Sequence, residues 1–383
     1  MAGEIQQLTR NAVDVLPAGA LEQKLKLGRP LRVKLGIDVT SPDIHVGRGV
    51  PLQRMRAFQD AGHVGVLIVG DYTTRIGDPS GRSAERPILT DDEIEANARK
   101  YVEQAMQILD PERTEVRYNG EWLSKLTFAD VVRLTRMMTV ARLLERDDFA
   151  KRYAAREPIS VSELLYPLMQ GYDSVAVEAD VELGGTDQLY NLLAGRDVME
   201  AYGLEPQVVL TVPLLRSWDG LKMSSSVGNN IPLTAPAEEQ FGRTMRIPDD
   251  LLEEWYRLVW ERDPPAGDPM AAKLALARFV VERSHGAEAA RGAEEHFTRV
   301  VREGQAPEDV PEAPLPAGDP LHLPALLVEL LGVASTSEAR RLIDQGGVRL
   351  DGEVVSELDF PRGRLEGALL QAGKRRFLRL TAP

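Results

Sequence analysis

The fold is decided by the stretch from Val33 to Arg86, which reads VKLGIDVTSPDIHVGRGVPLQRMRAFQDAGHVGVLIVGDYTTRIGDPSGRSAER. The apolar runs at 33–37 and 64–69 predict buried strands, because they are short and rich in β-branched residues. Residues 47–61, between them, have the spacing of a helix. Together they predict a β-α-β unit with a right-handed crossover. The turn before the helix then lies at the carboxyl edge of a parallel sheet, which suits a phosphate group.

That turn carries the sequence His45-Val46-Gly47-Arg48. A glycine at its third position lets a flat base or a ribose approach the backbone closely. His45 is placed to donate a hydrogen bond to a phosphate oxygen at the start of the helix. An H-x-G motif alone is weak evidence, because a surface histidine on an ordinary β-α turn gives the same pattern.

A second loop follows the apolar run 208–212 and reads Gly220-Leu221-Lys222-Met223-Ser224-Ser225-Ser226. A glycine- and serine-rich loop with one lysine is able to wrap a triphosphate and release it. With both loops, the chain resembles a class I aminoacyl-tRNA synthetase, whose HIGH signature matches residues 45–48 and whose KMSKS signature matches residues 222–226. Three further segments narrow the resemblance to the tyrosyl-tRNA synthetases and extend it over nearly the whole chain: GDPSGR at 77–82, LYPLMQGYD at 165–173 and LGGTDQ at 183–188.

Composition limits the classes of protein and of metal site. A chain of 383 residues predicts two or three domains. No apolar run reaches the ~20 residues that a membrane span needs, and the N-terminus lacks a signal-peptide pattern, so we expect a cytoplasmic protein. The chain has no cysteine for disulfides or thiolate metal sites, and its five scattered histidines argue against a histidine-built metal site.

The net charge of −13 does not favour an RNA partner, because phosphate contacts need lysine and arginine. Composition alone would favour an acidic soluble protein that binds no nucleic acid. The charge is unevenly distributed, however, since residues 321–383 carry nine Lys and Arg against eight Asp and Glu. This C-terminal segment resembles the S4-like RNA-binding domain, most clearly in SEARRLIDQGGVRLDGEVV at 337–355.

The element patterns predict an α/β protein with a Rossmann-like parallel sheet. We expect a helical arm at 1–30 and one long helical stretch at 128–153, broken once. In the family, an insertion at about 110–160 packs against a second subunit, so the resemblance implies a homodimer. The predicted parts are a catalytic domain at 1–235, an all-helical anticodon-binding domain at 236–302, a Pro-rich linker at 303–320 and a small α+β S4-like domain at 321–383.

The resemblance implies a two-step reaction. The carboxylate of tyrosine attacks the α-phosphate of ATP, and the resulting tyrosyl-adenylate then gives its tyrosyl group to tRNA(Tyr). The first step needs alignment and charge stabilisation, while Mg²⁺ is expected to arrive with ATP and to need no dedicated protein site. The residues implied for catalysis are Thr40, His45, Arg48, Arg82, Arg86 and Lys222.

The same resemblance implies a binding site for each small substrate. Asp173 matches the residue that accepts the phenolic proton of tyrosine, and Asp187 is a candidate for the ribose hydroxyls of ATP. The tyrosine site is implied to comprise Lys34, Thr73, Asp78, Tyr166, Gln170, Asp173 and Gln188. The ATP site is implied to comprise Gly36, Asp38, Gly47, Gly184, Asp187, Lys222, Met223 and Ser225.

Both signatures depart from the family pattern. Arg48 replaces the second histidine of HIGH, and Ser225 replaces the second lysine of KMSKS. Lys34 stands where many bacterial members have a phenol-binding tyrosine. A degenerate paralogue that binds tyrosine or tRNA but activates poorly therefore remains an alternative. A small-molecule adenylyltransferase of the H-x-G-H type is a third hypothesis, against which the S4-like segment and the tyrosine-site residues argue.

Overall fold

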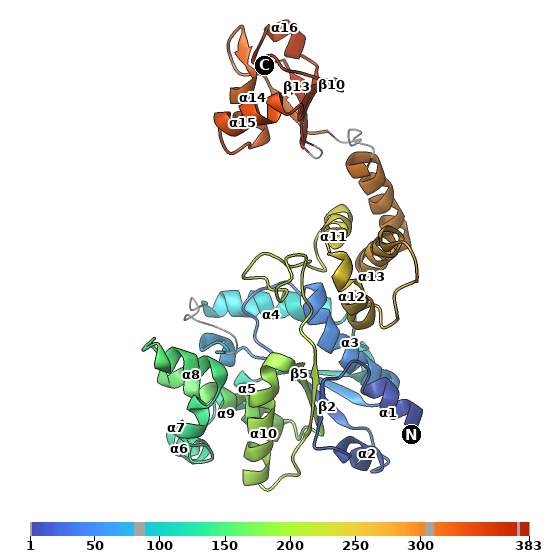
Figure 1. The fold of residues 1–383 in the computed structure, drawn as a ribbon. Coiled ribbons are helices and arrows are strands. Elements are labelled where there is room, and N and C mark those ends of the chain that lie inside the picture. The colour runs from blue at the N-terminus through green and yellow to red at the C-terminus, as the bar shows by residue number, and fades with distance from the viewer. Residues whose placement is uncertain (1, 80–88, 303–309, 374–375, 383) are drawn as a thin grey trace. The chain divides into compact units, whose positions relative to one another are not determined.

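The structure is a computed structural model that describes residues 2–79, 89–302, 310–373 and 376–382. The predicted catalytic residues Arg82 and Arg86 lie outside the described residues. The chain divides into two compact units, residues 1–236 with 243–280, and residues 237–242 with 281–383 (Figure 1). Each unit is described by itself below. Among the residues described, none of the helices has both the length and the apolar character needed to cross a bilayer.

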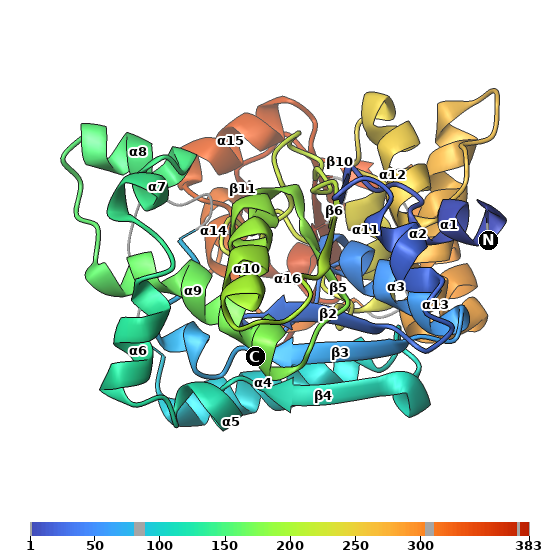
Figure 2. The ribbon, with the colours of Figure 1, turned by 90° about the horizontal axis from the view of Figure 1, so that it is seen from below.

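The first unit is built on a six-stranded sheet with the order β1-β6-β5-β2-β3-β4. All neighbouring strands are parallel except β1, which pairs antiparallel with β6 (Figure 2). The predicted α/β class with a parallel sheet is thus confirmed. The strands are β1 (Asp14–Leu16), β2 (Arg32–Ile37), β3 (Val64–Val69), β4 (Thr114–Tyr118), β5 (Val181–Gly185) and β6 (Val208–Val212).

The direction of strand addition reverses between β2 and β5. Strands β3 and β4 follow on one side of β2, and β6 follows on the far side of β5. Right-handed crossovers that run in opposite directions place their helices on opposite faces, here α3 (Val46–Asp60) after β2 and α10 (Leu189–Ala201) after β5. Such a switch point leaves a crevice at the carboxyl ends of the two central strands.

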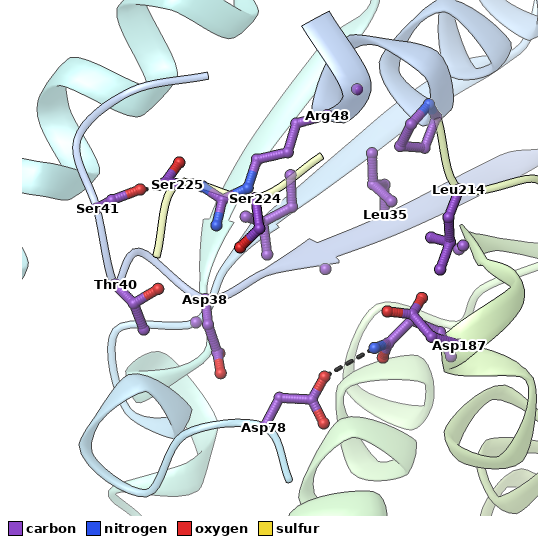
Figure 3. Close-up of a pocket in the computed structure, with 18 of the residues that line it drawn as sticks. Leu35, Asp38, Thr40, Ser41, Arg48, Asp78, Asp187, Leu214, Ser224 and Ser225 are labelled. Carbon is purple, nitrogen blue, oxygen red and sulfur yellow. Dashed lines mark hydrogen bonds between the residues drawn. The ribbon is translucent and has the colours of Figure 1, made fainter. Parts of the chain in front are cut away.

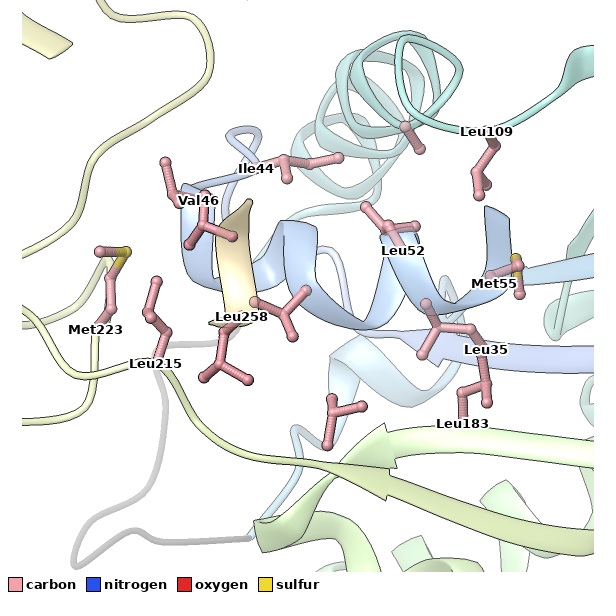
Figure 4. Close-up of a cluster of buried hydrophobic side chains, with 14 of the residues drawn as sticks. Leu35, Ile44, Val46, Leu52, Met55, Leu109, Leu183, Leu215, Met223 and Leu258 are labelled. Atoms are coloured by element: carbon pink, nitrogen blue, oxygen red, sulfur yellow. The ribbon is translucent and has the colours of Figure 1, made fainter. Parts of the chain in front are cut away.

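The helix α3 follows the prediction for the β-α-β unit closely. It begins after His45, which caps it, and it buries Leu52, Met55 and Phe58 in the main core. Figure 4 shows part of this cluster, which joins Met55 of α3 to Leu35 of β2, Leu183 of β5 and Leu258. The helix therefore fixes the position of its own first turn, where the H-x-G motif lies.

Three parts of the first unit differ from the sequence-based expectation. The N-terminal arm is interrupted by β1, which lies between α1 (Ala2–Leu8) and α2 (Ala20–Leu25). The stretch 128–153 is broken twice, because Thr139 caps a new helix and Arg146 precedes another. The apolar run 175–177 ends a helix, and the next strand, β5, was not predicted. The helices concerned are α6 (Phe128–Thr135), α7 (Val140–Leu144), α8 (Asp147–Ala154) and α9 (Val161–Ala176).

Two further helices of the first unit lie between β3 and the insertion helices in the chain. They are α4 (Asp91–Ala105) and α5 (Gly120–Leu123), with 3-10 turns at Thr73–Arg75, Pro111–Arg113, Thr186–Gln188 and Asp249–Leu251.

Residues 236–302 contain the predicted helices. Leu252, Trp255 and Tyr256 are buried in the same core as α3, so residues 243–280 cluster with the first unit rather than forming one separate body. The long helix α13 changes direction at Gly286, whose φ of 84° lies in the left-handed region. The helices are α11 (Ala237–Thr244), α12 (Leu252–Val259) and α13 (Pro269–Phe297), followed by a π-helical turn at Thr298–Arg302.

The second unit contains a five-stranded sheet with the order β10-β9-β12-β13-β7 and a separate β11-β8 pair. Its first strand, β7 (Glu312–Pro314), pairs parallel with β13, so the predicted linker at 303–320 is shorter than expected. The other strands are β8 (Leu321–His322), β9 (Val348–Leu350), β10 (Glu353–Val354), β11 (Asp359–Phe360), β12 (Leu369–Ala372) and β13 (Arg376–Thr381). The helices are α14 (Leu323–Leu331), α15 (Thr336–Asp344) and α16 (Arg362–Leu365).

Candidate active site

A cavity of about 1070 Å³ lies at the carboxyl ends of β2 and β5, where the strand order reverses (Figure 3). Residues from motifs more than 170 positions apart in the sequence line it together. The predicted site residues in its wall are Gly36, Asp38, Thr40, His45, Gly47, Arg48, Thr73, Asp78, Tyr166, Gln170, Asp173, Gly184, Asp187, Gln188, Lys222, Met223 and Ser225.

His45 lies at the N-terminal end of α3 and is 6% exposed. Its Nδ1 atom accepts a hydrogen bond of 3.3 Å from the backbone N–H of Arg48. Burial, together with the charges of Arg48 and Lys222, lowers the pKa of His45 to about 3. The ring is therefore neutral at physiological pH, and because Nδ1 is the acceptor, Nε2 carries the proton as a donor.

The two signature loops meet at Gly47. Its backbone N–H points to the sulfur of Met223 at 3.4 Å. A Cβ atom at this position would lie 3.2 Å from Nδ1 of His45, which is tight, and 3.5 Å from Cβ of Met223, which is an ordinary contact, so a larger residue would crowd the ring of His45. The close approach of a base or a ribose to this glycine stays a prediction, and the group that the structure places against its backbone is Met223 of the second loop.

The lysine loop is held by Asn229, which the sequence reasoning missed. The amide of Asn229 donates to the carbonyl of Lys222 at 3.2 Å, and its oxygen accepts from the N–H of Ser224 at 2.8 Å. The ammonium group of Lys222 forms an ion pair with Asp187. In this conformation Lys222, which was predicted to bind phosphate, and Asp187, which was predicted to bind the ribose, neutralise each other's charge.

Arg48 lies beside two groups that the sequence did not connect with it. One guanidinium nitrogen lies 3.4 Å from the hydroxyl oxygen of Ser41, and the guanidinium carbon lies 6.0 Å from the ring centroid of Tyr101. Tyr101, on α4, is 1% exposed, and its hydroxyl has no hydrogen-bond partner among the described residues. Burial raises the pKa of Tyr101 to about 12. Both Arg48 and Tyr101 line the cavity.

Asp173 is a buried carboxylate in the cavity wall, 3% exposed. It accepts hydrogen bonds from Trp122 Nε1 at 2.8 Å and from Asn119 Nδ2 at 3.3 Å. Burial raises the pKa of Asp173 to about 7, although the charge of Lys34 and these two hydrogen bonds act in the opposite direction. Asn119 and Trp122 were missed from the sequence, and their only signal is that they follow β4 at the same edge of the sheet.

Asp38 joins residues that were assigned to different substrates. Predicted to line the ATP site, it accepts hydrogen bonds from Thr73 Oγ1 at 2.7 Å and from Tyr166 Oη at 3.0 Å, both predicted tyrosine ligands. Gly70 makes this cluster possible, because a Cβ there would lie 2.4 Å from both Asp38 Oδ1 and Thr73 Oγ1. On another part of the wall, Gln188 donates to Asp78 Oδ2 at 2.7 Å, the bond drawn in Figure 3.

Lys34 is not part of the described wall. Its fully buried ammonium group donates to Glu182 Oε1 at 2.8 Å, to Ser174 Oγ at 2.7 Å and to the carbonyl of Gln170 at 2.8 Å. An ammonium group has three donors, so these three acceptors leave none for the phenol of a bound tyrosine. In this geometry Lys34 is therefore not the direct ligand of tyrosine that the sequence predicted, because its ion pair with Glu182 on β5 holds it in the core.

Comparison with known proteins agrees with the geometry. A family model described as tRNA synthetases class I (W and Y) matches residues 26–302, and a model of the S4 domain matches residues 323–361. The chain belongs to the class I tRNA synthetases of this type. The family predicted from the sequence motifs is thus confirmed, and with it the aminoacyl-tRNA ligase class of enzyme.

Curated relatives align with this synthetase from end to end. The tyrosine–tRNA ligase of Thermotoga maritima is 47% identical over 99% of this chain and 97% of its own length. That of Moorella thermoacetica is 48% identical over 99% of this chain and 96% of its own length. A solved tyrosyl-tRNA synthetase from Archaeoglobus fulgidus, in complex with L-tyrosine, has a TM-score of 0.64 at 23% identity and covers 76% of this chain and 99% of its own. The last comparison supports the fold.

Proposed function

We propose that this synthetase is a tyrosine–tRNA ligase, which activates L-tyrosine with ATP and transfers the tyrosyl group to tRNA(Tyr). The observation that carries the proposal is the set of residues that line one cavity. Two loops with His45 and Lys222 touch each other at Gly47, and the same wall contains the buried carboxylate of Asp173. Full-length relatives named as tyrosine–tRNA ligases support the same function.

In the activation step, a carboxylate oxygen of tyrosine forms a bond with the α-phosphorus of ATP while the bond from that phosphorus to the bridging oxygen breaks. Pyrophosphate leaves with the electron pair, and the chain needs no covalent intermediate. Neutral His45 donates from Nε2, while Arg48 and Lys222 compensate the charge that develops on the leaving group. Lys222 has to separate from Asp187 to do so. Arg82 and Arg86 remain proposed contributors.

Recognition of tyrosine depends on Asp173 at the phenol end and on Asp78 at the ammonium end. A phenol donates one hydrogen bond to Asp173, whereas phenylalanine would leave this buried group without its donor. A site built for such a hydrogen bond rejects the analogue that lacks it strongly, and tyrosyl-tRNA synthetases are the established example. Thr73, Tyr166 and Gln170 complete the proposed tyrosine site.

The remaining partners are proposed from charge and exposure. Mg²⁺ would arrive with ATP and be held by phosphate oxygens and water. The S4 domain would contact tRNA(Tyr), and the protein would act in the cytoplasm. A homodimer would form through the insertion, because large apolar side chains concentrate on its surface, with Phe128 84% exposed. The others are Val132, Val140, Tyr153 and, just past the insertion, Val161.

Tyrosine-dependent exchange of labelled pyrophosphate into ATP tests the proposal. We expect exchange with tyrosine and a far lower rate with phenylalanine at the same concentration. Folded protein that binds tyrosine but catalyses no exchange would be a degenerate paralogue. Exchange that proceeds equally with phenylalanine would remove the assigned role of Asp173.

A further inference from the structure

We infer that Arg146 is a positioning residue for tyrosine binding. From the insertion, its guanidinium group holds Asp78 and Gln188 in the arrangement that receives the α-ammonium group of the substrate. The inference rests on the proposed function, since it concerns the same cavity. Arg146 itself does not line the cavity and would act through the two residues that do.

Arg146 is fixed on several sides. It lies between α7 and α8 and is 7% exposed. Its Nε lies 2.8 Å from Asp148 Oδ1, and its guanidinium carbon lies 5.4 Å and 5.6 Å from the ring centroids of Phe149 and Tyr190. A planar guanidinium group clamped in this way has little freedom to turn, so the directions of its other donors are set by the fold.

Those other donors begin a closed ring of four side chains. Arg146 Nη1 donates to Asn191 Oδ1 at 2.8 Å, and Asn191 Nδ2 donates to Gln188 Oε1 at 3.2 Å. Gln188 Nε2 donates to Asp78 Oδ2 at 2.7 Å, and Asp78 Oδ1 lies 3.7 Å from Arg146 Nη2. Two cavity residues are thereby tied to the insertion through one amide and one ion pair.

The hydrogen bonds of the ring can run in only one direction. A guanidinium group can only donate and an ionised carboxylate can only accept, so both intervening amides must present their oxygen toward Arg146 and their nitrogen toward Asp78. Gln188 therefore offers an N–H to Asp78.

Two substitutions of Arg146 test whether tyrosine binding depends on the geometry of the guanidinium group or only on its charge. Arg146→Lys keeps the charge but lacks the planar fork that reaches Asn191, Asp148 and Asp78 together, and Arg146→Met keeps only the stem. We expect both to raise the Kd for tyrosine at least tenfold. The Kd for 3-(4-hydroxyphenyl)propionate, which has the phenol and the carboxylate but no ammonium group, should change less than twofold, as should the KM for ATP in pyrophosphate exchange.

Arg142 provides a matched control. It lies four residues earlier on α7, and its side chain also contacts α10, through an ion pair of 2.7 Å with Asp197, but this side chain is 49% exposed. Arg142→Lys and Arg142→Met should leave the Kd for tyrosine within twofold of the parent. Asn191→Leu breaks the link to Gln188 without changing Arg146, and it should reproduce the selective loss even if an Arg146 variant folds poorly.

The possible results are distinct. An equal loss of affinity for tyrosine and for the analogue would mean that the site has collapsed as a whole, which overturns the inference. Unchanged or tighter tyrosine binding in the Arg146 variants, or full rescue of affinity by lysine, would also overturn it. A parent protein that binds no tyrosine would instead refute the proposed function.

Discussion

Replacement of Asp173 by asparagine should make the ligand-free protein more stable at pH 8 while removing its selectivity for tyrosine. The carboxyl group is 3% exposed, and burial raises its pKa from 3.8 to about 7. Between these two values the folded protein holds a proton that the unfolded chain has released. The contribution of Asp173 to stability therefore falls as the pH rises through this window, and above it the ionised, buried carboxylate destabilises the fold.

The magnitude follows from the change in pKa. Roughly three pH units at 1.36 kcal/mol each correspond to ~4 kcal/mol above pH 7, of which ~2.5 kcal/mol develops between pH 5 and pH 8. Asparagine removes this cost but places an N–H where Asn119 Nδ2 donates to Oδ2, and one such mismatch costs about 1–3 kcal/mol. The variant should thus be more stable than the parent by about 1–3 kcal/mol at pH 8, and this gain should vanish by pH 5.

Urea denaturation of the parent and of Asp173→Asn at several pH values from 5 to 8 measures this difference. Titration of His45 cancels, because both proteins contain it. Asp180→Asn is the control: Asp180 is also buried, and although burial acts to raise its pKa, the hydrogen bonds from Arg29 and from the Arg32 backbone, together with nearby cations, lower it. Asp180 therefore loses its stabilising effect only below pH 3.8, so its variant should differ from the parent by a constant amount from pH 5 to 8.

Binding measurements on the same protein complete the test. Loss of a hydrogen bond to a charged acceptor should weaken tyrosine binding by ~1.5–3 kcal/mol, or about 10- to 150-fold, while phenylalanine binding changes little. A stability difference that does not depend on pH would show that Asp173 is not a destabilised carboxylate. An unchanged ratio of tyrosine to phenylalanine affinity would refute its contact with the phenol.

Three further predictions concern other parts of the site and chain. Because the pKa of His45 is lowered to about 3, the rate of adenylate formation should show no titration of this residue between pH 5 and 8, whereas His45→Asn should slow it at least tenfold in pre-steady-state measurements. Removal of residues 310–383 should leave pyrophosphate exchange intact but lower tRNA charging and its salt dependence, and loss of both activities would mean that this segment supports the fold of the rest of the chain. If Arg48 compensates for the serine at 225, Arg48→His should slow activation and the double variant with Ser225→Lys should restore it. Equal rates in the parent, Arg48→His, Ser225→Lys and the double variant would place both residues away from the phosphates.

The sequence predicted the parts of the structure that local patterns determine. The β-α-β unit and the two signature loops depend on residues close in the chain, and the structure places the loops against one cavity. The sheet edge formed by β1 could not be predicted in this way, because its partner lies almost 200 residues later in the sequence, with Asp14 opposite Thr211. Strand β5 was missed because the apolar run before it belongs to a helix.

The same limit applies to the site. Asp173 belongs to a recognisable motif, but its partners Asn119 and Trp122 and the more distant Arg146 belong to none. Asn119 reaches the cavity, and Trp122 and Arg146 reach residues of its wall, only because parallel strands end at one edge of the sheet and because the insertion folds back onto α10. Lys34 was assigned to the site in error, and the cause is related. Its position in the sequence pattern identified a side chain near the phenol site, but not the ion pair that it forms with Glu182 on β5.

The ion pair of Lys34 with Glu182 determines how this enzyme can be redesigned for larger substrates. Bulkier para-substituents on tyrosine need more space near Asp173, and Lys34 and Glu182 are two fully buried charges close enough to act on Asp173. Glu182 also accepts hydrogen bonds from Ser174 at 2.9 Å and from Gln207 at 2.7 Å. Truncation of Lys34 or Glu182 alone leaves the other as an unpaired charge in the core, at a cost of about 3–5 kcal/mol. Replacement of both by well-packed apolar residues avoids that cost. A library that varies positions 34 and 182 together should therefore yield folded variants that single substitutions miss.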